Sequence, residues 1–417
     1  MIPSRINVSS RRDFLREGLF GFSAAATVPL FLGKSIHAAS RAAQPDDDRI
    51  LVVVQLSGGN DGLSTVVPYS DPAYGRARRQ THIPEEQVLR INDRVGLHPA
   101  LGHLKKLYED GHLSVIQGVS YPNPNRSHFE SMDVWHSGST EGARTGTGWI
   151  GRAVDSACKN RENPLLSINV GNNSPLALFG NHHRPISIPK NGRPTLGRRR
   201  KASTRDSGTT NAGPSALREL DFLVRVAANA ESSFKTIRTA VQDYRPRVDF
   251  PRNPLANDLR TVAAMLDAGL PTRVYYVALG GFDTHANQRG RHDNLMRQLS
   301  NALGAFVNEL ETRKLLDRVL VLTFTEFGRR VQENASQGTD HGVAGPVFLM
   351  GNKIRPGIHG DHPSLTELVG GDLTMNVDFR RVYASVLEDW IGTPAAPILG
   401  EGYESLPLIG SKRIARF

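Results

Sequence analysis

Short apolar runs alternate with amphipathic stretches along most of the chain. The runs at 50–57, 274–279 and 318–325 are apolar and rich in β-branched or aromatic residues, which is typical of strands buried on both faces of a sheet. Further strands are predicted at 113–119, 164–170 and 345–351, and helices at 98–111, 127–136, 146–158, 216–244, 257–269, 293–310 and 378–390. Because strands and helices alternate, the pattern predicts an α/β fold with a mostly parallel sheet wrapped by helices.

Carboxylate and imidazole side chains follow the three strongest strand predictions. Taken singly, each is equally well a turn residue or an exposed side chain. Because the carboxyl ends of parallel strands lie at one edge of a sheet, we expect these side chains to form one polar site. Carboxylates and neutral imidazoles are ordinary ligands of zinc or manganese. The candidates, including two from a nearby loop, are Asp61, Asp283, His285, Glu326, Asp340 and His341.

A proline-containing segment, 121–126, leads into a predicted helix that begins with Ser-His-Phe-Glu at 127–130, the pattern of a capping box. A helix N-terminus offers unpaired N–H groups and the positive end of a dipole, which favour anions. Ser127 is therefore either the helix cap alone or a nucleophile activated by a metal ion. Arg126 and His128, on either side of it, are further candidate catalytic residues.

Composition and charge narrow the class of protein. The apolar content of 39% in 417 residues is that of a globular protein, and Cys158 is the only cysteine, which excludes an intramolecular disulfide and a thiolate metal cluster. Much of the net charge of +10 lies in 190–205, within a Pro-, Gly-, Arg- and Thr-rich stretch, 180–214, that we interpret as a flexible basic insertion. No nucleic-acid-binding pattern accompanies it, so we expect a solvated loop and no nucleic acid partner.

The N-terminus has the pattern of an export signal. The segment Ser10–Arg16 contains the pair Arg11 and Arg12 followed by Phe-Leu, and a short apolar stretch and small residues near Ala38 follow. This resembles a twin-arginine signal peptide, 1–39, read by the twin-arginine translocation machinery. We therefore expect the chain to be exported to the periplasm, the cell surface or the medium. No later run approaches ~20 apolar residues, so no integral membrane span is expected in the mature chain.

Several motifs together resemble the exported bacterial family called domain of unknown function 1501. Besides the paired arginines, they are Leu-Ser-Gly-Gly-Asn-Asp-Gly at 56–62, Asn-Arg-Ser-His-Phe at 125–129, Gly-Phe-Asp-Thr-His at 281–285, Thr-Glu-Phe-Gly-Arg at 325–329 and Asp-His-Gly at 340–342. That family is similar to the alkaline phosphatase and sulfatase superfamily. The resemblance implies one domain over 46–410 with an alkaline phosphatase-like, three-layer α/β/α sandwich and a metal site at the strand ends.

The resemblance also implies roles for particular residues. Ser127 would be the nucleophile, with Arg126 or Arg329 holding the anion of the substrate. The metal candidates named above would hold one or two divalent ions, whether zinc, manganese, magnesium or calcium. The chain departs from the superfamily at Phe327, where a metal-binding histidine is expected, and Cys158 lacks the sulfatase pattern Cys-x-Pro-x-Arg.

Two functions remain open on the sequence. The first is a metal-dependent hydrolase of phosphate or sulfate esters, acting on a small anionic ester or on a polymer. The second is a non-catalytic exported protein that retains the hydrolase fold and binds a ligand or a surface. The retained carboxylates and histidines favour the first function, and Phe327 favours the second.

The export signal is testable by itself. Changing Arg11 and Arg12 to Lys keeps the charge but removes the paired arginines, so the chain should stay in the cytoplasm with its leader uncut. Cell fractionation and the mass of the purified chain measure both effects. Export of the double variant at the parental level would contradict the interpretation.

Overall fold

The computed structural model describes residues 48–158, 163–172, 174–190, 194–197 and 231–410. The chain divides into two units, 1–48 and 49–417. All described residues except residue 48 lie in the second unit. The predicted signal peptide, 1–39, and the last part of the predicted insertion, 198–214, lie outside them.

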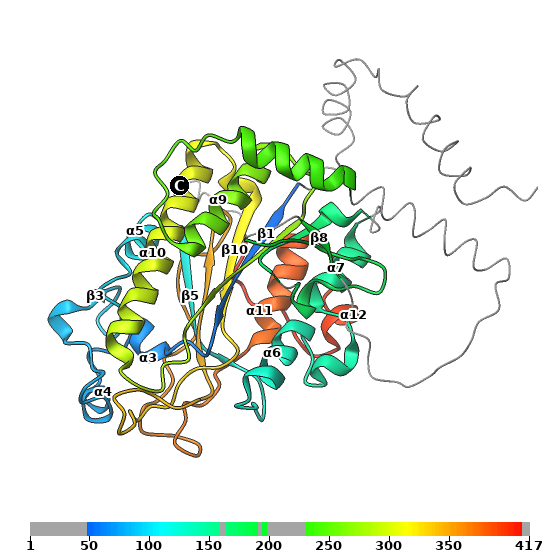
Figure 1. The fold of residues 1–417 in the computed structure, drawn as a ribbon. Coiled ribbons are helices and arrows are strands. Elements are labelled where there is room, and N and C mark those ends of the chain that lie inside the picture. The colour runs from blue at the N-terminus through cyan, green and yellow to red at the C-terminus, as the bar shows by residue number, and fades with distance from the viewer. Residues whose placement is uncertain (1–47, 159–162, 173, 191–193, 198–230, 411–417) are drawn as a thin grey trace, which may run out of the picture. The chain divides into compact units, whose positions relative to one another are not determined.

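A ten-stranded sheet lies at the centre of the described unit (Figure 1). Its middle strand, β1 (Ile50–Ser57), pairs in parallel with β9 (Val274–Gly280) and with β10 (Val319–Phe324). The strand order is β12-β5-β11-β10-β1-β9-β6-β7-β8, with β13 beside β5. The other strands are β5 (Leu113–Ser120), β6 (Ser167–Val170), β7 (Ile186–Ile188), β8 (Thr195–Leu196), β11 (Gly345–Met350), β12 (Gly357–His359) and β13 (Val377–Asp378). Among these strands, only β11 and β8 pair antiparallel to their neighbours, which confirms the mostly parallel sheet.

Helices cover both faces of this sheet (Figure 1). Ile50, Val52 and Val54 of β1 pack into the core on one face, and Leu51 and Val53 pack into the core on the other, because successive side chains of a strand point to opposite faces. The first face carries α5 (Gly102–Glu109), α9 (Pro254–Asp267) and α10 (Gln288–Thr312). The second carries α6 (His128–Ser137), α7 (Trp149–Ala157), α11 (Phe379–Ser385), a π-helical turn, η7 (Val386–Ile391), and α12 (Ala396–Leu399). The three-layer α/β/α sandwich is therefore confirmed.

A second, three-stranded sheet was not expected. It has the order β2-β4-β3 and packs, with two short helices, over a small apolar core of its own. Its elements are β2 (Val66–Val67), β3 (Leu89–Arg90), β4 (Gly96–Leu97), α3 (Gly62–Thr65) and α4 (Pro72–Ala77). Short 3₁₀ turns complete the fold at η2 (Glu85–Gln87), η3 (Gly142–Thr145), η4 (Pro164–Leu166), η5 (Leu176–Leu178) and η6 (Leu316–Arg318). Strands of two residues have no readable alternation, so the pattern could not predict this sheet.

Two further expectations need correction. The predicted insertion, 180–214, contains the edge strands β7 and β8, because Ile186 and Ile188 add to the parallel edge beside β6. The predicted helix at 378–390 changes from α to π winding after Ser385. Of the predicted helix 216–244, the described part, 231–243, is helical.

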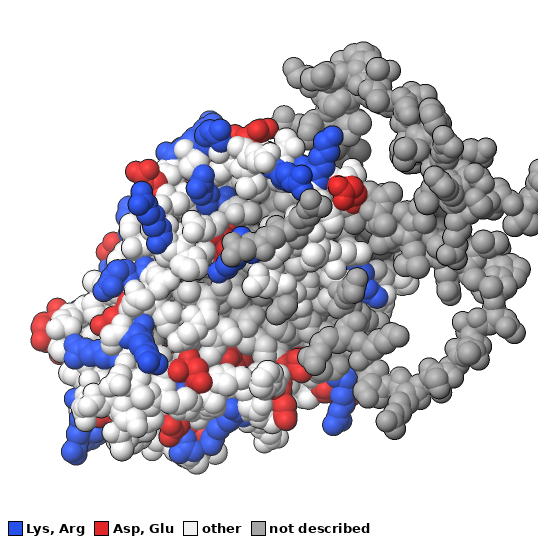
Figure 2. Space-filling model, in the orientation of Figure 1, with Lys and Arg blue, Asp and Glu red and all other residues white. Residues whose placement is uncertain are grey.

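Two properties of the surface complete the description. On the face that carries α9 and α10, Lys and Arg side chains are interspersed with Asp and Glu (Figure 2). Within the part of the chain that the structure describes, no helix combines the length and the apolar character needed to cross a membrane.

Candidate functional site

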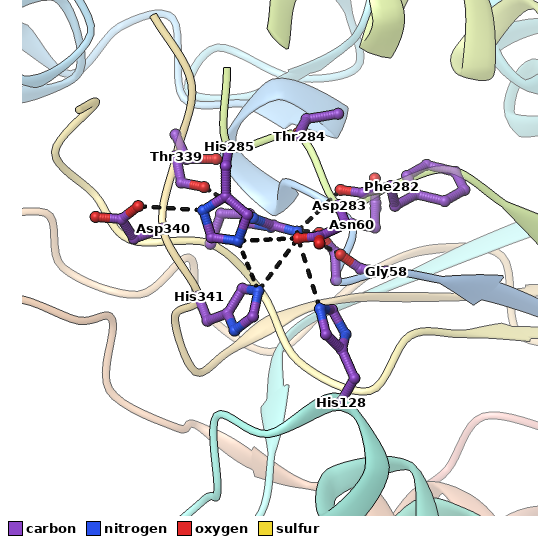
Figure 3. A network of polar contacts seen from close by, with 12 residues as sticks. Gly58, Asn60, His128, Phe282, Asp283, Thr284, His285, Thr339, Asp340 and His341 are labelled. Carbon is purple, nitrogen blue, oxygen red and sulfur yellow. Dashed lines mark hydrogen bonds and ion pairs between the residues drawn. The ribbon is translucent and has the colours of Figure 1, made fainter. Parts of the chain in front are cut away.

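The loops at one edge of the central sheet bring most of the predicted site residues together. Asp283 and His285 follow β9, Glu326 follows β10, and His128 begins α6 beyond the end of β5. Because β11 runs antiparallel, the loop before its start reaches the same edge and adds His341. We call His128, Asp283, His285 and His341 the histidine–carboxylate centre (Figure 3).

One carboxylate oxygen lies in the middle of this centre. Asp283 Oδ1 is 3.0 Å from His285 Nε2, 3.2 Å from His341 Nε2 and 3.5 Å from His128 Nε2. It also accepts a hydrogen bond of 2.8 Å from Arg329 Nη2. Burial raises the pKa of Asp283, but the hydrogen bond and the positive charge of Arg329 outweigh it and lower that pKa to about 2. Asp283 is therefore an anion at neutral pH.

Glu326 orients the ring of His128 through its Nδ1 atom, on the side away from Asp283. His128 Nδ1 lies 2.8 Å from Glu326 Oε1, which also accepts a 2.8 Å hydrogen bond from the backbone N–H of Gly58. The hydrogen bond to Glu326 raises the pKa of His128. Because an ionised carboxylate only accepts hydrogen bonds, Nδ1 of His128 carries the proton. Oε1 of Glu326 is occupied by these two donors and Oε2 accepts from Thr325 Oγ1 at 3.2 Å, so Glu326 supports His128 here, and direct binding of a metal by Glu326 stays a prediction.

The other two imidazoles are oriented in the same way. His285 Nδ1 lies 3.2 Å from Asp340 Oδ1, and His341 Nδ1 lies 2.8 Å from the backbone oxygen of Arg126. Both partners are acceptors, so they suit the tautomer with the proton on Nδ1, which leaves each Nε2 as an acceptor. Asp340 thus contacts His285 at Nδ1, the ring nitrogen that faces away from Asp283, and is not part of the histidine–carboxylate centre.

This arrangement points three nitrogen lone pairs at one carboxylate. With Nδ1 protonated, the Nε2 of a neutral imidazole is an acceptor, and His285 Nε2 and His341 Nε2 lie 2.9 Å apart. His128 Nε2 is buried and has no hydrogen-bond partner among the described residues. Four acceptor atoms that face one another need a cation or protons between them, because acceptors otherwise repel.

The spacing of these atoms fits a divalent cation. The ligand atoms of His128, Asp283 and His341 all lie within 4.8 Å of one another. Two ligands held ~2.0–2.1 Å from a tetrahedral ion lie roughly 3.3 Å apart. The three Nε2 atoms lie 3.0–3.5 Å from Asp283 Oδ1, and those of His285 and His341 lie 2.9 Å apart. Acceptor-bound Nδ1 atoms behind the ligands are also the usual support of metal-binding histidines. These residues therefore fit a metal ion.

Arg329 fastens the loops beneath the centre. Its side chain is fully buried, and its guanidinium donates to the backbone oxygens of Gly59 at 2.7 Å, Thr339 at 2.8 Å, Phe282 at 3.0 Å and also Gly58. The prediction that Arg329 could hold a substrate anion is wrong, because its donors face backbone oxygens and Asp283.

The absence of a side chain at Gly58 allows this close packing of loops. Gly58 has a φ of +118°, and a Cβ atom there would lie 2.5 Å from the backbone nitrogen of Asp283. Only glycine accepts both the conformation and the contact. Any larger residue at this position would push the loop after β1 away from Asp283 and from Glu326.

Asp61 lies outside the centre, in a buried ion pair. Its Oδ2 is 2.6 Å from Arg78 Nη1 and 2.7 Å from Ser64 Oγ, and Gln288 donates to the same oxygen at 2.5 Å. Arg78 Nη2 lies 3.1 Å from Oδ1. Burial raises the pKa of Asp61, but Arg78 reverses this and keeps it well below its usual range. The prediction that Asp61 binds a metal is not supported, because a guanidinium already neutralises its carboxylate.

Ser127 starts α6 without capping it. The structure shows no capping hydrogen bond from its hydroxyl, whereas the backbone N–H of Ser127 donates to Asn125 Oδ1 at 2.7 Å. The predicted capping box is wrong, because Glu130 pairs with the amide of Asn125. The Arg126 side chain pairs with Asp372.

Phe327, the departure from the superfamily pattern, packs against the centre. Its buried ring lies 4.6 Å from the ring of His341 and 4.9 Å from that of His128, measured between centroids. Its ring forms an apolar wall beside both imidazoles.

The fold and site define an α/β protein with a histidine–carboxylate centre at the carboxyl edge of its sheet. A family model described as "Protein of unknown function (DUF1501)" matches residues 48–388. The chain belongs to this family. The search among curated proteins finds no match.

Three solved structures show partial similarity to this chain. The C-terminal periplasmic domain of EcEptC from Escherichia coli, in complex with Zn, is 11% identical, covers 74% of this chain and 73% of that chain, and has a TM-score of 0.38. The PsFucS1 sulfatase from Pseudoalteromonas sp. is 9% identical, with coverages of 91% and 75% and a TM-score of 0.39. A protein in the alkaline phosphatase superfamily from Vibrio parahaemolyticus is 11% identical, with coverages of 77% and 64% and a TM-score of 0.36.

The ion pair between Asp61 and Arg78 yields a stability prediction. Asp61→Asn leaves a buried guanidinium without its counter-charge, so the free energy of unfolding should fall by about 3–5 kcal/mol. Urea denaturation followed by circular dichroism measures the change. The exposed Asp93→Asn serves as the matched control and should stay within about 0.5 kcal/mol of the parent. If Asp61→Asn were as stable as the control, the assigned role would fail.

Proposed function

We propose that this protein is an exported hydrolase of phosphate or sulfate esters that uses a divalent cation held by His128, Asp283 and His341. The observation that carries the proposal is the convergence of three Nε2 atoms on Asp283 Oδ1, each imidazole being fixed by an acceptor at Nδ1. His285 would be the fourth ligand. A set of imidazoles with one carboxylate favours zinc over magnesium or calcium.

The side chains around the centre support ester hydrolysis. A cation bound there would polarise the ester oxygens and lower the pKa of a nearby hydroxyl. Ser127 directly precedes His128, and its hydroxyl is not used to cap α6, so its oxygen can attack phosphorus or sulfur. The ester's bond to its alcohol breaks, the alcohol leaves with the proton that Ser127 gives up, and water then releases phosphate or sulfate from Ser127. The first N–H groups of α6 would then receive the negative oxygens of the ester.

Arg126 takes a positioning role in this proposal. Its backbone oxygen holds Nδ1 of His341, and its guanidinium pairs with Asp372, so it fixes the chain immediately before Ser127. The alternative function is a non-catalytic exported binding protein. Phe327 favours it, because an apolar ring stands where the superfamily pattern has a ligand.

The first test measures metal content. The protein purified without chelator should contain about one divalent ion per chain, since the centre offers one set of ligands. His341→Ala removes one of them and should lower the affinity for the ion by about tenfold or more while the chain remains folded. Elemental analysis and titration with zinc measure both quantities.

The control for this test is His103→Ala. His103 is an exposed histidine on α5 and should leave the metal content unchanged. A parent protein without metal, or an identical load in His341→Ala, would remove the basis of the proposal.

The second test concerns Ser127 as the nucleophile. A panel of aryl phosphates, phosphodiesters and aryl sulfates first identifies a working substrate. Ser127→Ala should then reduce kcat by about 1,000-fold or more, because the attacking oxygen is lost. Its melting temperature should barely change, since the hydroxyl forms no capping bond whose loss would cost about 1 kcal/mol.

Ser139→Ala, which changes a half-buried serine just beyond the other end of α6, is the matched control and should keep the parental rate. An active parent whose Ser127→Ala variant keeps its full rate would place the nucleophile elsewhere. A parent that holds metal and hydrolyses no ester in the panel would favour the binding-protein function.

A further inference from the structure

A buried chain of hydrogen bonds joins the segment before α6 to the end of β10. Tyr121 directly follows β5, and its phenol oxygen accepts a hydrogen bond of 2.9 Å from the backbone N–H of Asn125. The same phenol donates to Ser131 Oγ at 3.1 Å, and Ser131 donates in turn to the backbone oxygen of Glu326 at 2.6 Å. We call Tyr121 and Ser131 the hydroxyl pair. They are 3% and 0% exposed, so neither contacts a substrate.

The two ends of this chain of hydrogen bonds fix its direction. A backbone N–H can only donate and a backbone oxygen can only accept, so each hydroxyl of the pair accepts one hydrogen bond and donates one. Buried hydrogen bonds in series polarise and strengthen one another. The hydroxyl pair is therefore placed to hold main-chain atoms, and its protons are not directed at an ester.

One end of the chain of hydrogen bonds holds the segment that carries Ser127. Tyr121 binds the backbone nitrogen of Asn125, and Asn125 Oδ1 accepts a hydrogen bond of 2.7 Å from the backbone N–H of Ser127. The phenol thus connects both ends of the proline-containing segment 121–125. Because Ser127 lies only two residues beyond this segment, the position of its hydroxyl depends on the contact with Tyr121.

The other end aligns α6 with Glu326. The helix contacts Glu326 twice, since Ser131 Oγ binds its backbone oxygen and His128 Nδ1 lies 2.8 Å from its Oε1. Ser131 follows His128 by three residues, so both side chains lie on the same face of α6. Two contacts with one residue fix the rotation of the helix, which a single contact leaves free. His128 Nε2 is thereby directed at Asp283 Oδ1.

We propose that Tyr121 and Ser131 are positioning residues, of which Tyr121 aligns the hydroxyl of Ser127 and Ser131 aligns the imidazole of His128. The roles of Ser127 as nucleophile and of His128 as metal ligand rest on the proposed function, whereas the alignment does not. Each member of the pair acts on a different end of the chain of hydrogen bonds, so the two substitutions should have different effects. A pair that only stabilised the fold would change every property of the site together.

The first variant is Tyr121→Phe, which keeps the buried ring and removes the hydroxyl. The amides of Asn125 and Ser127 lose their support and should exchange with deuterium about tenfold faster. With the ester that the panel identifies, kcat should fall by about tenfold or more at an unchanged KM, because the attacking group is misplaced while binding is retained. The affinity for zinc should stay parental, since Ser131 still contacts Glu326.

The control for this variant is Tyr244→Phe. Tyr244 is a buried tyrosine whose phenol donates to Glu309 at 2.7 Å, outside the site. Its loss removes a comparable hydrogen bond and should leave kcat, zinc affinity and the exchange of both amides unchanged.

The second variant is Ser131→Ala, which frees α6 from the backbone of Glu326. Alanine is smaller than serine and favours a helix, so the chain should fold. In the metal-free protein, the NMR signal of the proton on His128 Nδ1, which lies downfield because of Glu326, should move upfield. Zinc titrated by calorimetry should bind about tenfold more weakly, because the support of a ligand is lost. Ser385→Ala is the matched control, since this buried helical serine also donates to a backbone oxygen, that of Leu406 at 3.0 Å.

Three outcomes would overturn the proposal: parental deuterium exchange in Tyr121→Phe, a parental Nδ1 proton signal in Ser131→Ala, or the same loss of zinc affinity in both variants. The first two measurements need neither an ion nor an ester. A parent that binds no zinc or hydrolyses no ester, together with faster exchange in Tyr121→Phe and a shifted signal in Ser131→Ala, would overturn only the proposed function.

Discussion

The buried guanidinium of Arg329 is the interaction on which the rest of the site depends. It donates to backbone oxygens in three loops, those after β1 and β9 and the one between β10 and β11, and to the carboxylate of Asp283. Such a charge is tolerated inside a protein only when its donors are paired. The geometry of the histidine–carboxylate centre is therefore set by main-chain atoms, which vary less in position than exposed side chains.

Two buried arginines give two carboxylates different chemistry. Arg78 and its neighbours enclose Asp61, whose carboxylate is fully buried. Arg329 contacts Asp283 from one side, and the carboxylate remains 49% exposed and in reach of three imidazoles. Both pairs neutralise a carboxylate, but only the second leaves an oxygen available for other partners. Asp61 and Asp283 both follow a strand of the sheet, but Asp61 stabilises the fold, whereas Asp283 lies at the centre of the site.

The sequence predicted the layers of the fold and the edge at which the polar residues meet. It did so because buried strands are long apolar runs and because Asp283 and Glu326 stand directly at their ends. The sequence could not show that Asp61 has a different role from Asp283. The carboxylate of Asp61 is neutralised by Arg78, and no local pattern in the sequence reveals that Arg78 is buried.

The wide spacing of the site residues along the chain has a consequence for where a cation would be acquired. His128 and Glu326 are 198 residues apart, and Gly58 and Glu326 are 268 apart, so the centre exists only after β1 has paired with β10. Before that, each histidine is a single weak ligand. The metal ions available in the cellular compartment where the sheet closes, more than the affinity of the finished site, would then decide which ion the protein carries.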